Sequence, residues 1–184
     1  TLFRSNQGAA IEVSAGSWGR KNMSAEYGGV SKDGSVDLVR REFPNVKVIA
    51  NLDNRGFSRA NNQAIRECSG ELVLLLNPDT VVEEDCLKTC IEHFQANPST
   101  GGLGVRMIDG TGHFLPESKR GLPTPDVAFY KMSGLNSFFP KHPKFGKYYL
   151  SYQDPEAENK VEVLSGAFMM MRKSVLDQIG LLDE

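Results

Sequence analysis

The sequence predicts an α/β domain, a sheet whose strands are joined by crossover helices. Strand-like and helix-like segments alternate from residue 35 onward, as in folds whose parallel strands are joined by helices. Leu72–Leu76 is a continuous apolar run of the kind that a parallel sheet buries on both faces. The chain has 184 residues, 40% of them hydrophobic and 24% charged, which is enough for one domain with its own core.

The expected elements follow one another in a regular order. They are a helix from Ser35 to Pro44, a strand at Val46–Ala50, a helix from Phe57 to Gly70, a strand at Leu72–Leu76, a helix from Glu83 to Asn97, strands at Gly102–Ile108 and Val161–Met171, and a helix at Ser174–Ile179. Ser35 can cap the first helix and Pro44 stops it, while Gly70 ends the second. The acids at 83–85 suit the positive end of the third helix dipole. Each strand is a short, mostly apolar run.

Two segments fall outside this alternation. Residues 109–160 contain six prolines and two short helical possibilities, and loops of that length are usually functional. Residues 1–30 are rich in Gly, Ser and Ala. An α/β domain needs an opening strand, so this segment either supplies a weak one or leaves the sheet incomplete.

Composition excludes several classes of protein. The 21 Lys and Arg residues against 23 Asp and Glu give a formal charge of −2, which argues against nucleic acid as a main partner. Three cysteines, Cys68, Cys86 and Cys90, are an odd number without framework spacing, which favours a reducing compartment and a cytoplasmic protein. No apolar run approaches the ~20 residues of a membrane span, so any membrane contact would be peripheral.

The strand at Leu72–Leu76 ends abruptly in the polar residues Asn77-Pro78-Asp79. Ligands of open α/β sheets bind beyond the carboxyl ends of strands, where Asn77 and Asp79 would lie. A carboxylate there suits Mg²⁺ or Mn²⁺ shared with substrate phosphates, which makes Asp79 the candidate metal ligand. Asn-Pro-Asp is also good turn chemistry, and on these residues alone the turn is the simpler interpretation.

A second polar cluster lies at the start of the helix from Phe57. Asn54 and Gly56 form a turn before it, and Asn61 and Asn62 lie one turn inside, with Asn61 near the face that we expect to be buried. A buried amide requires partners, so these residues are candidates for a ligand site. A capping turn with solvated asparagines is an equally good interpretation.

Three shorter motifs are also candidates for ligand contact. Asp33 lies in a loop before a helix N-terminus, a position suited to an anion or to ribose hydroxyls. Gly166 and Ala167 interrupt an apolar strand with small residues, which allows a ligand to approach closely, although a β-bulge would use the same residues. Lys119 and Arg120 could contact an acceptor or donor phosphate, whereas a solvated basic pair is the simpler interpretation.

Taken together, these motifs resemble family 2 glycosyltransferases of the GT-A fold over about residues 31–184. The residues that carry the resemblance are Asp33-Gly34-Ser35, Asn54-Arg55-Gly56-Phe57, Asn77-Pro78-Asp79, Leu103-Gly104-Val105, Ser165-Gly166-Ala167-Phe168, Arg172 and Gly180-Leu181-Leu182-Asp183-Glu184. The likeness extends to rhamnosyltransferase-like members that build bacterial surface polysaccharides.

The resemblance implies a Rossmann-like, mixed, mostly parallel sheet with flanking helices, which binds a nucleotide-diphosphate sugar across its strand ends. Asp79 would stand in the family's metal-binding Asp-x-Asp, and a bound Mg²⁺ or Mn²⁺ would hold the diphosphate. An acceptor hydroxyl would attack the anomeric carbon and invert it while a carboxylate takes the proton. The candidates on the donor side are Asp33, Asn54, Gly56, Asn61, Asn62, Asn77 and Asp79, and those on the acceptor side are Lys119, Arg120, Gly166 and Ala167.

The resemblance also raises an alternative to catalysis. Tyr27, Gly28 and Gly29 stand where family members usually carry Val-Asp-Asn, whose Asp helps to hold the nucleotide. The family's usual base lies in a segment expected after residue 184, so Asp183 and Glu184 are substitute candidates and the domain is expected to be incomplete at both ends. The alternative is a catalytically inactive nucleotide-sugar-binding or scaffold domain. A nucleotidyltransferase fits less well, because it would need a Gly-rich, basic phosphate loop near its first strand.

Eight of the fifteen Phe and Tyr residues lie at 129–152, interleaved with lysines. Aromatic rings beside lysines suit sugar stacking or a lipid-headgroup surface, which fits a glycan or lipid-linked acceptor and a peripheral contact with the inner face of the plasma membrane. A loop that packs its aromatic residues on the sheet is the simpler interpretation. An incomplete sheet also leaves an edge that could pair in a homodimer.

Overall fold

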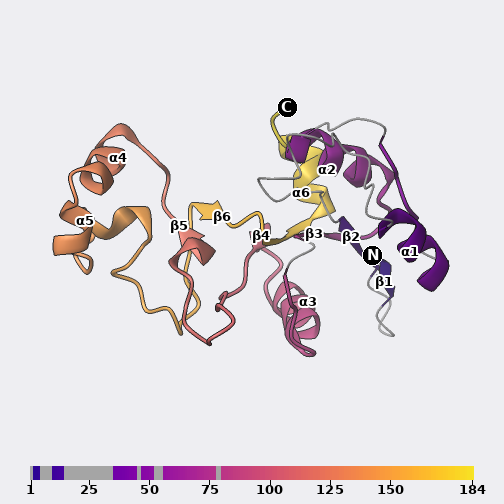
Figure 1. The fold of residues 1–184 in the computed structure, drawn as a ribbon, viewed down its shortest axis with the longest axis horizontal. Coiled ribbons are helices and arrows are strands. Elements are labelled where there is room, and N and C mark those ends of the chain that lie inside the picture. The colour runs from indigo at the N-terminus through magenta and orange to yellow at the C-terminus, as the bar shows by residue number, and fades with distance from the viewer. Residues whose placement is uncertain (1, 5–9, 15–34, 45–46, 52–55, 78–79) are drawn as a thin grey trace. The chain divides into compact units, whose positions relative to one another are not determined.

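The computed structural model describes residues 2–4, 10–14, 35–44, 47–51, 56–77 and 80–184 (Figure 1). The chain divides into two compact units. Unit 1 comprises Thr1–Gly102 and Met170–Glu184, and unit 2 comprises Leu103–Met169. The prediction of a single domain over residues 1–184 stays a prediction.

A five-stranded sheet in the order β1-β2-β3-β7-β4 is the central element of the α/β architecture. The strands are β1 (Leu2–Arg4), β2 (Ala10–Ser14), β3 (Leu72–Leu76), β4 (Gly102–Leu103) and β7 (Phe168–Arg172). β2 and β3 are parallel, with Ile11 opposite Leu72. β1 pairs with the other edge of β2 in the antiparallel direction. Along the chain α2, β3, α3 and β4 alternate, and α6 follows β7, so the predicted α/β class is confirmed.

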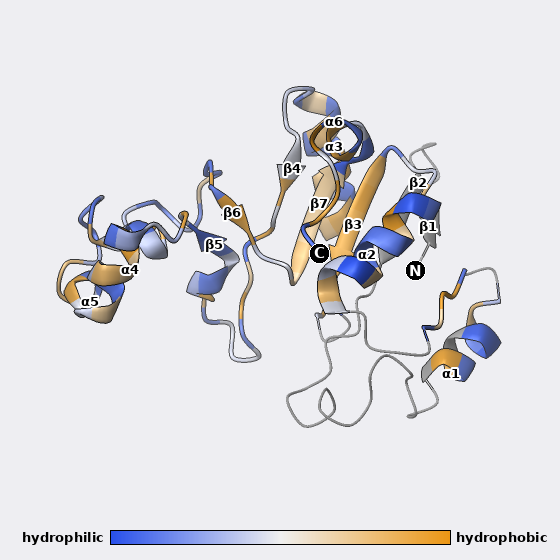
Figure 2. Cartoon of the chain, turned by 90° about the horizontal axis from the view of Figure 1, so that it is seen from above, coloured by the Kyte–Doolittle hydropathy of each residue, from blue (hydrophilic) through white to orange (hydrophobic). Residues whose placement is uncertain are grey.

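β3 lies at the buried centre of unit 1. Residues 72–75 are each at most 4% exposed, so both faces of the strand are covered. Figure 2 shows β3 and β7 in the orange of hydrophobic residues. Helices α2 (Gly56–Glu67) and α3 (Cys86–Ala96) lie on opposite sides of β3 (Figure 1). Ile65 of α2 and Phe94 of α3 are almost fully buried.

The predicted helices of unit 1 are confirmed with small shifts of their ends. α1 (Ser35–Glu42) stops before Pro44, and α6 (Lys173–Ile179) ends before Gly180, which has φ of +93°. α3 begins at Cys86 rather than at Glu83, because the backbone N–H of Cys86 bonds to the Glu83 carbonyl in a turn that precedes the helix. β3 has the predicted bounds.

The predicted strand at Val46–Ala50 is wrong for the residues that can be described. Residues 47–50 belong to no strand, and residues 45–46 lie outside the described residues. The edge of β2 that faces away from β3 is already paired with β1, so it offers no hydrogen-bonding edge to a further strand.

Two other predicted strands are shorter than expected. The strand at Gly102–Ile108 is limited to β4, because the chain then folds back on itself and Ile108 forms a bridge with Phe114. The strand at Val161–Met171 is divided into β6 (Val163–Leu164) and β7 by the small residues at 165–167. We expected residues 1–30 either to supply a weak opening strand or to leave the sheet incomplete. They supply β2, which pairs with β3 as the opening parallel strand.

Unit 2 contains the proline-rich segment and has a small core of its own. Its elements are η1 (Pro116–Ser118), β5 (Lys119–Arg120), α4 (Pro125–Met132), α5 (Leu135–Phe138), η2 (Gly146–Tyr148) and β6. β5 pairs with β6 in the antiparallel direction. Val127 and Leu150 are buried, and the rings of Tyr130 and Phe145 meet edge to face at 5.1 Å. α4 and α5 are the two short helices that the sequence allows.

The helices of the described residues are short. The longest, α2, has 12 residues, whereas a bilayer span needs about 20. None of the described helices could therefore cross a membrane.

Candidate functional site

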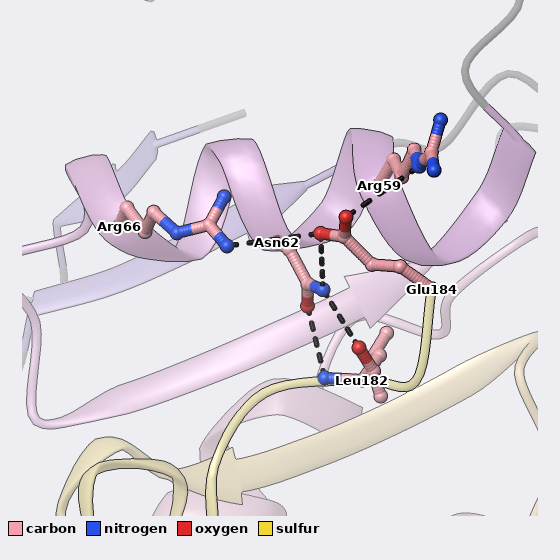
Figure 3. A network of polar contacts seen from close by, with 5 residues as sticks. All are labelled: Arg59, Asn62, Arg66, Leu182 and Glu184. Carbon is pink, nitrogen blue, oxygen red and sulfur yellow. Dashed lines mark hydrogen bonds and ion pairs between the residues drawn. The ribbon is translucent and has the colours of Figure 1, made fainter.

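Helix α2 and strand β3 run in opposite directions, so the start of the helix lies toward the carboxyl end of the strand. Only residues 68–71 separate Glu67 at the end of α2 from Leu72. The 12 residues of α2 span about 18 Å and the five of β3 about 17 Å, so the two elements match in length. Figure 3 shows them side by side. Gly56 and Asn77, two predicted donor-side residues, therefore lie toward the same end of unit 1.

Asn77 follows β3 and is half-buried. Its backbone carbonyl accepts a hydrogen bond of 3.1 Å from the N–H of Thr80, the bond expected of a turn at residues 77–80. Asn77 therefore lies where β3 ends, and its side-chain amide oxygen is of the hard kind that divalent cations prefer. Asp79, the predicted metal ligand, lies outside the described residues, as do Asp33 and Asn54.

Gly56 begins α2 in a conformation that favours glycine. Its φ is +75°, in the left-handed region, and an added Cβ would meet no atom within 4 Å. The requirement for glycine here comes from the backbone rather than from crowding.

Asn61 and Asn62 are buried, with 0% and 1% of their surface exposed. The interpretation of solvated asparagines at a capping turn is therefore wrong. The Asn61 amide donates to the Phe57 carbonyl at 2.8 Å, so it has the partner that burial demands.

Asn62 binds a segment that lies 120 residues further along the chain (Figure 3). Its Nδ2 donates to the Leu182 carbonyl at 2.7 Å and to Oε1 of Glu184 at 2.9 Å. Its Oδ1 accepts from the Leu182 N–H at 2.9 Å. Both amide hydrogens of Asn62 are thus committed to residues 182–184.

Glu184 lies between two arginines of the same helix (Figure 3). Its Oε2 is 3.5 Å from Nε of Arg59, and its Oε1 is 3.7 Å from a terminal nitrogen of Arg66. The hydrogen bond from Asn62, together with the charges of Arg66 and Arg59, holds the pKa of Glu184 below its usual value. A carboxylate with a lowered pKa is a weaker base, so these contacts favour a positioning role for Glu184 over the predicted role of base.

The arginines of this network were not among the predicted site residues. Arg59, Asn62 and Arg66 are spaced at i, i+3 and i+7 and therefore share one face of α2. That spacing is visible in the sequence, but the partner carboxylate more than 115 residues away is not. Asp183, the other candidate base, is exposed.

On the predicted acceptor side, Lys119 is not the solvated cation of the simpler interpretation. It is 8% exposed, and its Nζ donates to the Gln153 carbonyl at 3.0 Å. Burial lowers the pKa of Lys119, while the charge of Asp154 acts in the opposite direction. Nε of the neighbouring Arg120 and Oε1 of Gln153 are buried without a hydrogen-bond partner among the described residues.

Gly166 and Ala167 lie in the short break between β6 and β7. The Ala167 N–H bonds to the Ser165 hydroxyl at 3.4 Å. β6 is paired with β5, so Lys119, Arg120 and the small residues belong to one continuous part of unit 2. Their role toward an acceptor stays a prediction.

The sequence profile of glycosyl transferase family 2 matches residues 29–180. The chain belongs to this family. Membership confirms the predicted family and the GT-A fold that it implies. The matched region includes the buried asparagines of α2, the end of β3 and the break before β7.

Curated relatives of this family 2 chain act in glycan assembly. N-acetylglucosaminyl-diphospho-decaprenol L-rhamnosyltransferase of Mycobacterium tuberculosis is 26% identical over 84% of the chain and 53% of its own length. The low-salt glycan biosynthesis hexosyltransferase Agl10 of Haloferax volcanii is 30% identical over 89% of the chain and 52% of its own length. Poly-beta-1,6-N-acetyl-D-glucosamine synthase of Staphylococcus aureus is 32% identical over 40% of the chain and 18% of its own length.

The chain spans about half the length of the first two of these relatives. No solved structure matches it significantly.

Proposed function

We propose that this family 2 chain is the donor-binding part of a glycosyltransferase that moves a sugar from a nucleotide-diphosphate donor to a glycan or lipid-linked acceptor. The observation that carries the proposal is the family match across residues 29–180, which contains the strand end at Asn77 and the helix start at Gly56. The name of the mycobacterial relative describes an acceptor on a lipid diphosphate, and that of the haloarchaeal relative describes glycan biosynthesis. A cell-envelope glycan is therefore the acceptor class that we favour.

The donor would bind beyond the carboxyl end of β3. In open α/β sheets this is where the crevice lies, and the positive end of α2 points to the same end of unit 1. Asn77 and Asp79 supply oxygen donors, which is the donor chemistry that Mg²⁺ or Mn²⁺ prefers. A divalent cation held there would offset the charge of the departing nucleoside diphosphate.

Asn61 and Asn62 would contribute to the donor side by positioning other parts of unit 1 rather than by contacting the donor. Asn61 ties its amide to its own helix, and Asn62 fixes residues 182–184. The side chain of Glu184 is thereby held against α2, with Asp183 beside it in sequence. We place the inverting attack of the acceptor hydroxyl in this region, with Asp183 as a candidate base that has no such arginine pair in the described residues.

The second candidate function is a catalytically inactive nucleotide-sugar-binding or scaffold domain. It is favoured by Tyr27, Gly28 and Gly29, which stand where the family usually carries a nucleotide-holding Asp; these positions lie outside the described residues. The lowered basicity of Glu184 agrees with it as well.

We place the protein on the cytoplasmic side of the membrane, as a peripheral partner of its inner face. None of the three cysteines forms a disulfide in the described residues, which suits a reducing compartment. β1 and β4 are the edges of the sheet, and an exposed edge strand could pair in a homodimer. Sedimentation equilibrium at several concentrations tests the dimer, since a monomer at all of them would reject it.

The experiment that tests the proposed function is calorimetric titration of this chain with UDP, dTDP and GDP, each with and without Mn²⁺. We expect one nucleotide to bind, and to bind only with the metal. No binding of any nucleotide by the folded chain would contradict both candidate functions. Binding, followed by release of nucleoside diphosphate from the matching nucleotide-sugar, would favour the transferase over the inactive domain.

A further inference from the structure

Unit 2 presents an unusual concentration of large apolar side chains to solvent. Four of the twelve exposed large apolar side chains of the described residues lie within the eleven positions 129–139. They are Phe129, Met132, Phe138 and Phe139, which are 62%, 89%, 79% and 54% exposed. A contiguous exposed apolar patch is typically a contact surface for a protein or a membrane.

These side chains are not simply an unpacked core. Other rings of the same segment pack on one another, with Tyr130 against Phe145 at 5.1 Å and Tyr148 against Tyr149 at 4.7 Å. Val127 on α4 is 2% exposed. The helical pair α4 and α5 therefore has a packed interior, to which Phe129 and Phe139 each contribute one ring contact, at 6.0 Å with Tyr130 and 5.8 Å with Phe145. We call the surface of this pair that carries Phe129, Met132, Phe138 and Phe139 its outer side.

Lysines are interleaved with the apolar side chains in the sequence of this segment. Residues 125–148 contain four lysines and one aspartate, although the whole chain carries a formal charge of −2. Lys147 is 3.7 Å from Glu162, but no salt bridge joins Lys131, Lys141 or Lys144 to an acid in the described residues. All three of these lysines are exposed. Nζ of Lys131 lies 3.7 Å from the centre of the Tyr148 ring, and a side-chain hydrogen bond with Tyr148 raises the pKa of Lys131.

We propose that the outer side of α4 and α5 is a docking surface for an anionic phospholipid bilayer. Phe and Met side chains inserted at the level of the headgroups would remove apolar surface from water, while lysines beside them attract anionic lipids. Neither attraction alone holds a protein firmly on a membrane, and this segment combines both. The inference rests on the peripheral membrane contact proposed above, and it assigns that contact to a surface of unit 2 and to anionic lipids.

Sedimentation of the chain with vesicles tests the proposal. The probes are vesicles of equal parts phosphatidylglycerol and phosphatidylcholine, compared with vesicles of phosphatidylcholine alone. We expect binding to the anionic vesicles that weakens as salt is added. These vesicles contain no glycan acceptor and no nucleotide, so the result does not depend on the proposed transferase activity.

Two double variants separate the apolar and electrostatic contributions. Met132→Ser with Phe138→Ser removes the two most exposed apolar side chains of the patch, and Lys141→Glu with Lys144→Glu reverses its charge. Each pair should weaken binding at least about tenfold, since a single lysine near an anionic surface already changes affinity several-fold. The matched controls are Val81→Ser with Ile179→Ser, which removes two equally exposed apolar side chains of unit 1, and Lys88→Glu on α3.

Circular dichroism establishes that each variant is folded. Folded wild-type chain that ignores anionic vesicles would overturn the proposal. Unit 2 variants that bound as tightly as the wild type would also overturn it. So would unit 1 control variants that lost as much binding as the unit 2 variants. Binding of the wild type to a protein partner rather than to lipid would identify a different occupant and reject the membrane.

Discussion

The amide of Asn62 donates a hydrogen bond of 2.9 Å to the carboxylate of Glu184, which lies 122 residues further along the chain. The same amide bonds to the backbone of Leu182 in both directions. A single buried side chain on α2 therefore fixes the segment that carries both candidate bases. This contact connects the donor-side helix of unit 1 to residues that follow the matched region, which ends at residue 180.

Replacing Asn62 with alanine should destabilise unit 1 by about 3 kcal/mol. The change removes three hydrogen bonds and leaves the N–H and carbonyl of the half-buried Leu182 without this partner. Urea denaturation followed by circular dichroism measures the effect. Asn97→Ala, which removes an exposed bond to the His93 carbonyl, is the matched control and should cost about 1 kcal/mol or less. Equal midpoints for wild type and Asn62→Ala would contradict the role given to Asn62.

Glu184→Gln should lower stability in a manner that depends on pH. The pKa of Glu184 is lowered from its ordinary value of 4.5 by Asn62, Arg66 and Arg59, so the folded state favours the ionised form. The ionised carboxylate therefore stabilises the fold fully above pH 4.5, and this contribution disappears as the pH falls through the lowered pKa. Urea denaturation of both proteins across that range measures the difference.

The stability difference between wild type and Glu184→Gln should thus shrink on acidification. Glu92→Gln, on α3, is a control that removes a carboxylate outside this network. A difference for Glu184→Gln that grew at acidic pH would have the wrong sign and would refute the pairing with the arginines.

Arg172→Leu should destabilise unit 1 by about 2–3 kcal/mol. Nη2 of Arg172 donates to the Phe94 carbonyl at 2.6 Å, and its Nε donates to the Thr100 carbonyl at 2.9 Å, so it satisfies carbonyls at and beyond the end of α3. Its guanidinium also lies 5.0 Å from the centre of the Phe94 ring. A thermal melt checks the effect, with Lys88→Leu on the exposed side of the same helix as control. An unchanged melting temperature for Arg172→Leu would contradict this capping role.

Gly146→Ala should destabilise unit 2 by at least about 1–3 kcal/mol. An added Cβ would collide with the backbone carbonyl oxygen of Pro140, which cannot move away as a flexible side chain could. Gly110→Ala is the control, because a Cβ there meets nothing within 4 Å. Limited proteolysis within residues 103–169 should speed up for Gly146→Ala alone. Equal cleavage of both variants would contradict the close packing of η2 against Pro140.

The elements that the sequence could predict are those whose signals are local. Leu72–Leu76 is apolar throughout and has turn-forming residues after it, so both its class and its bounds follow from the pattern. α1 and α6 follow from a cap, a proline and a glycine in the same way. Burial of Asn61 also follows, since it lies on the apolar face of its helix.

Strand pairing and long-range polar contacts could not be predicted in this way. The pattern of residues 47–50 predicts a strand, but a strand must pair with a free edge of the sheet. The outer edge of β2 is not free, because β1 pairs with it. The apolar run after Gly102 gives no sign that Ile108 would fold back to Phe114. The partnership of Asn62 with Glu184 depends on tertiary structure across 122 residues, which no periodicity reports.

The donor site at the end of β3 is tested most directly by the affinity of the chain for a nucleoside diphosphate with Mn²⁺, compared between wild type and Asp79→Ala. We predict metal-dependent binding that Asp79→Ala weakens at least about tenfold. Mutation of a residue that only supports a metal ligand already lowers metal affinity by about that factor. Asp85→Ala, at the N-cap of α3, should bind as the wild type does. Equal, metal-independent binding by wild type and Asp79→Ala would contradict a metal-assisted donor site at this strand end.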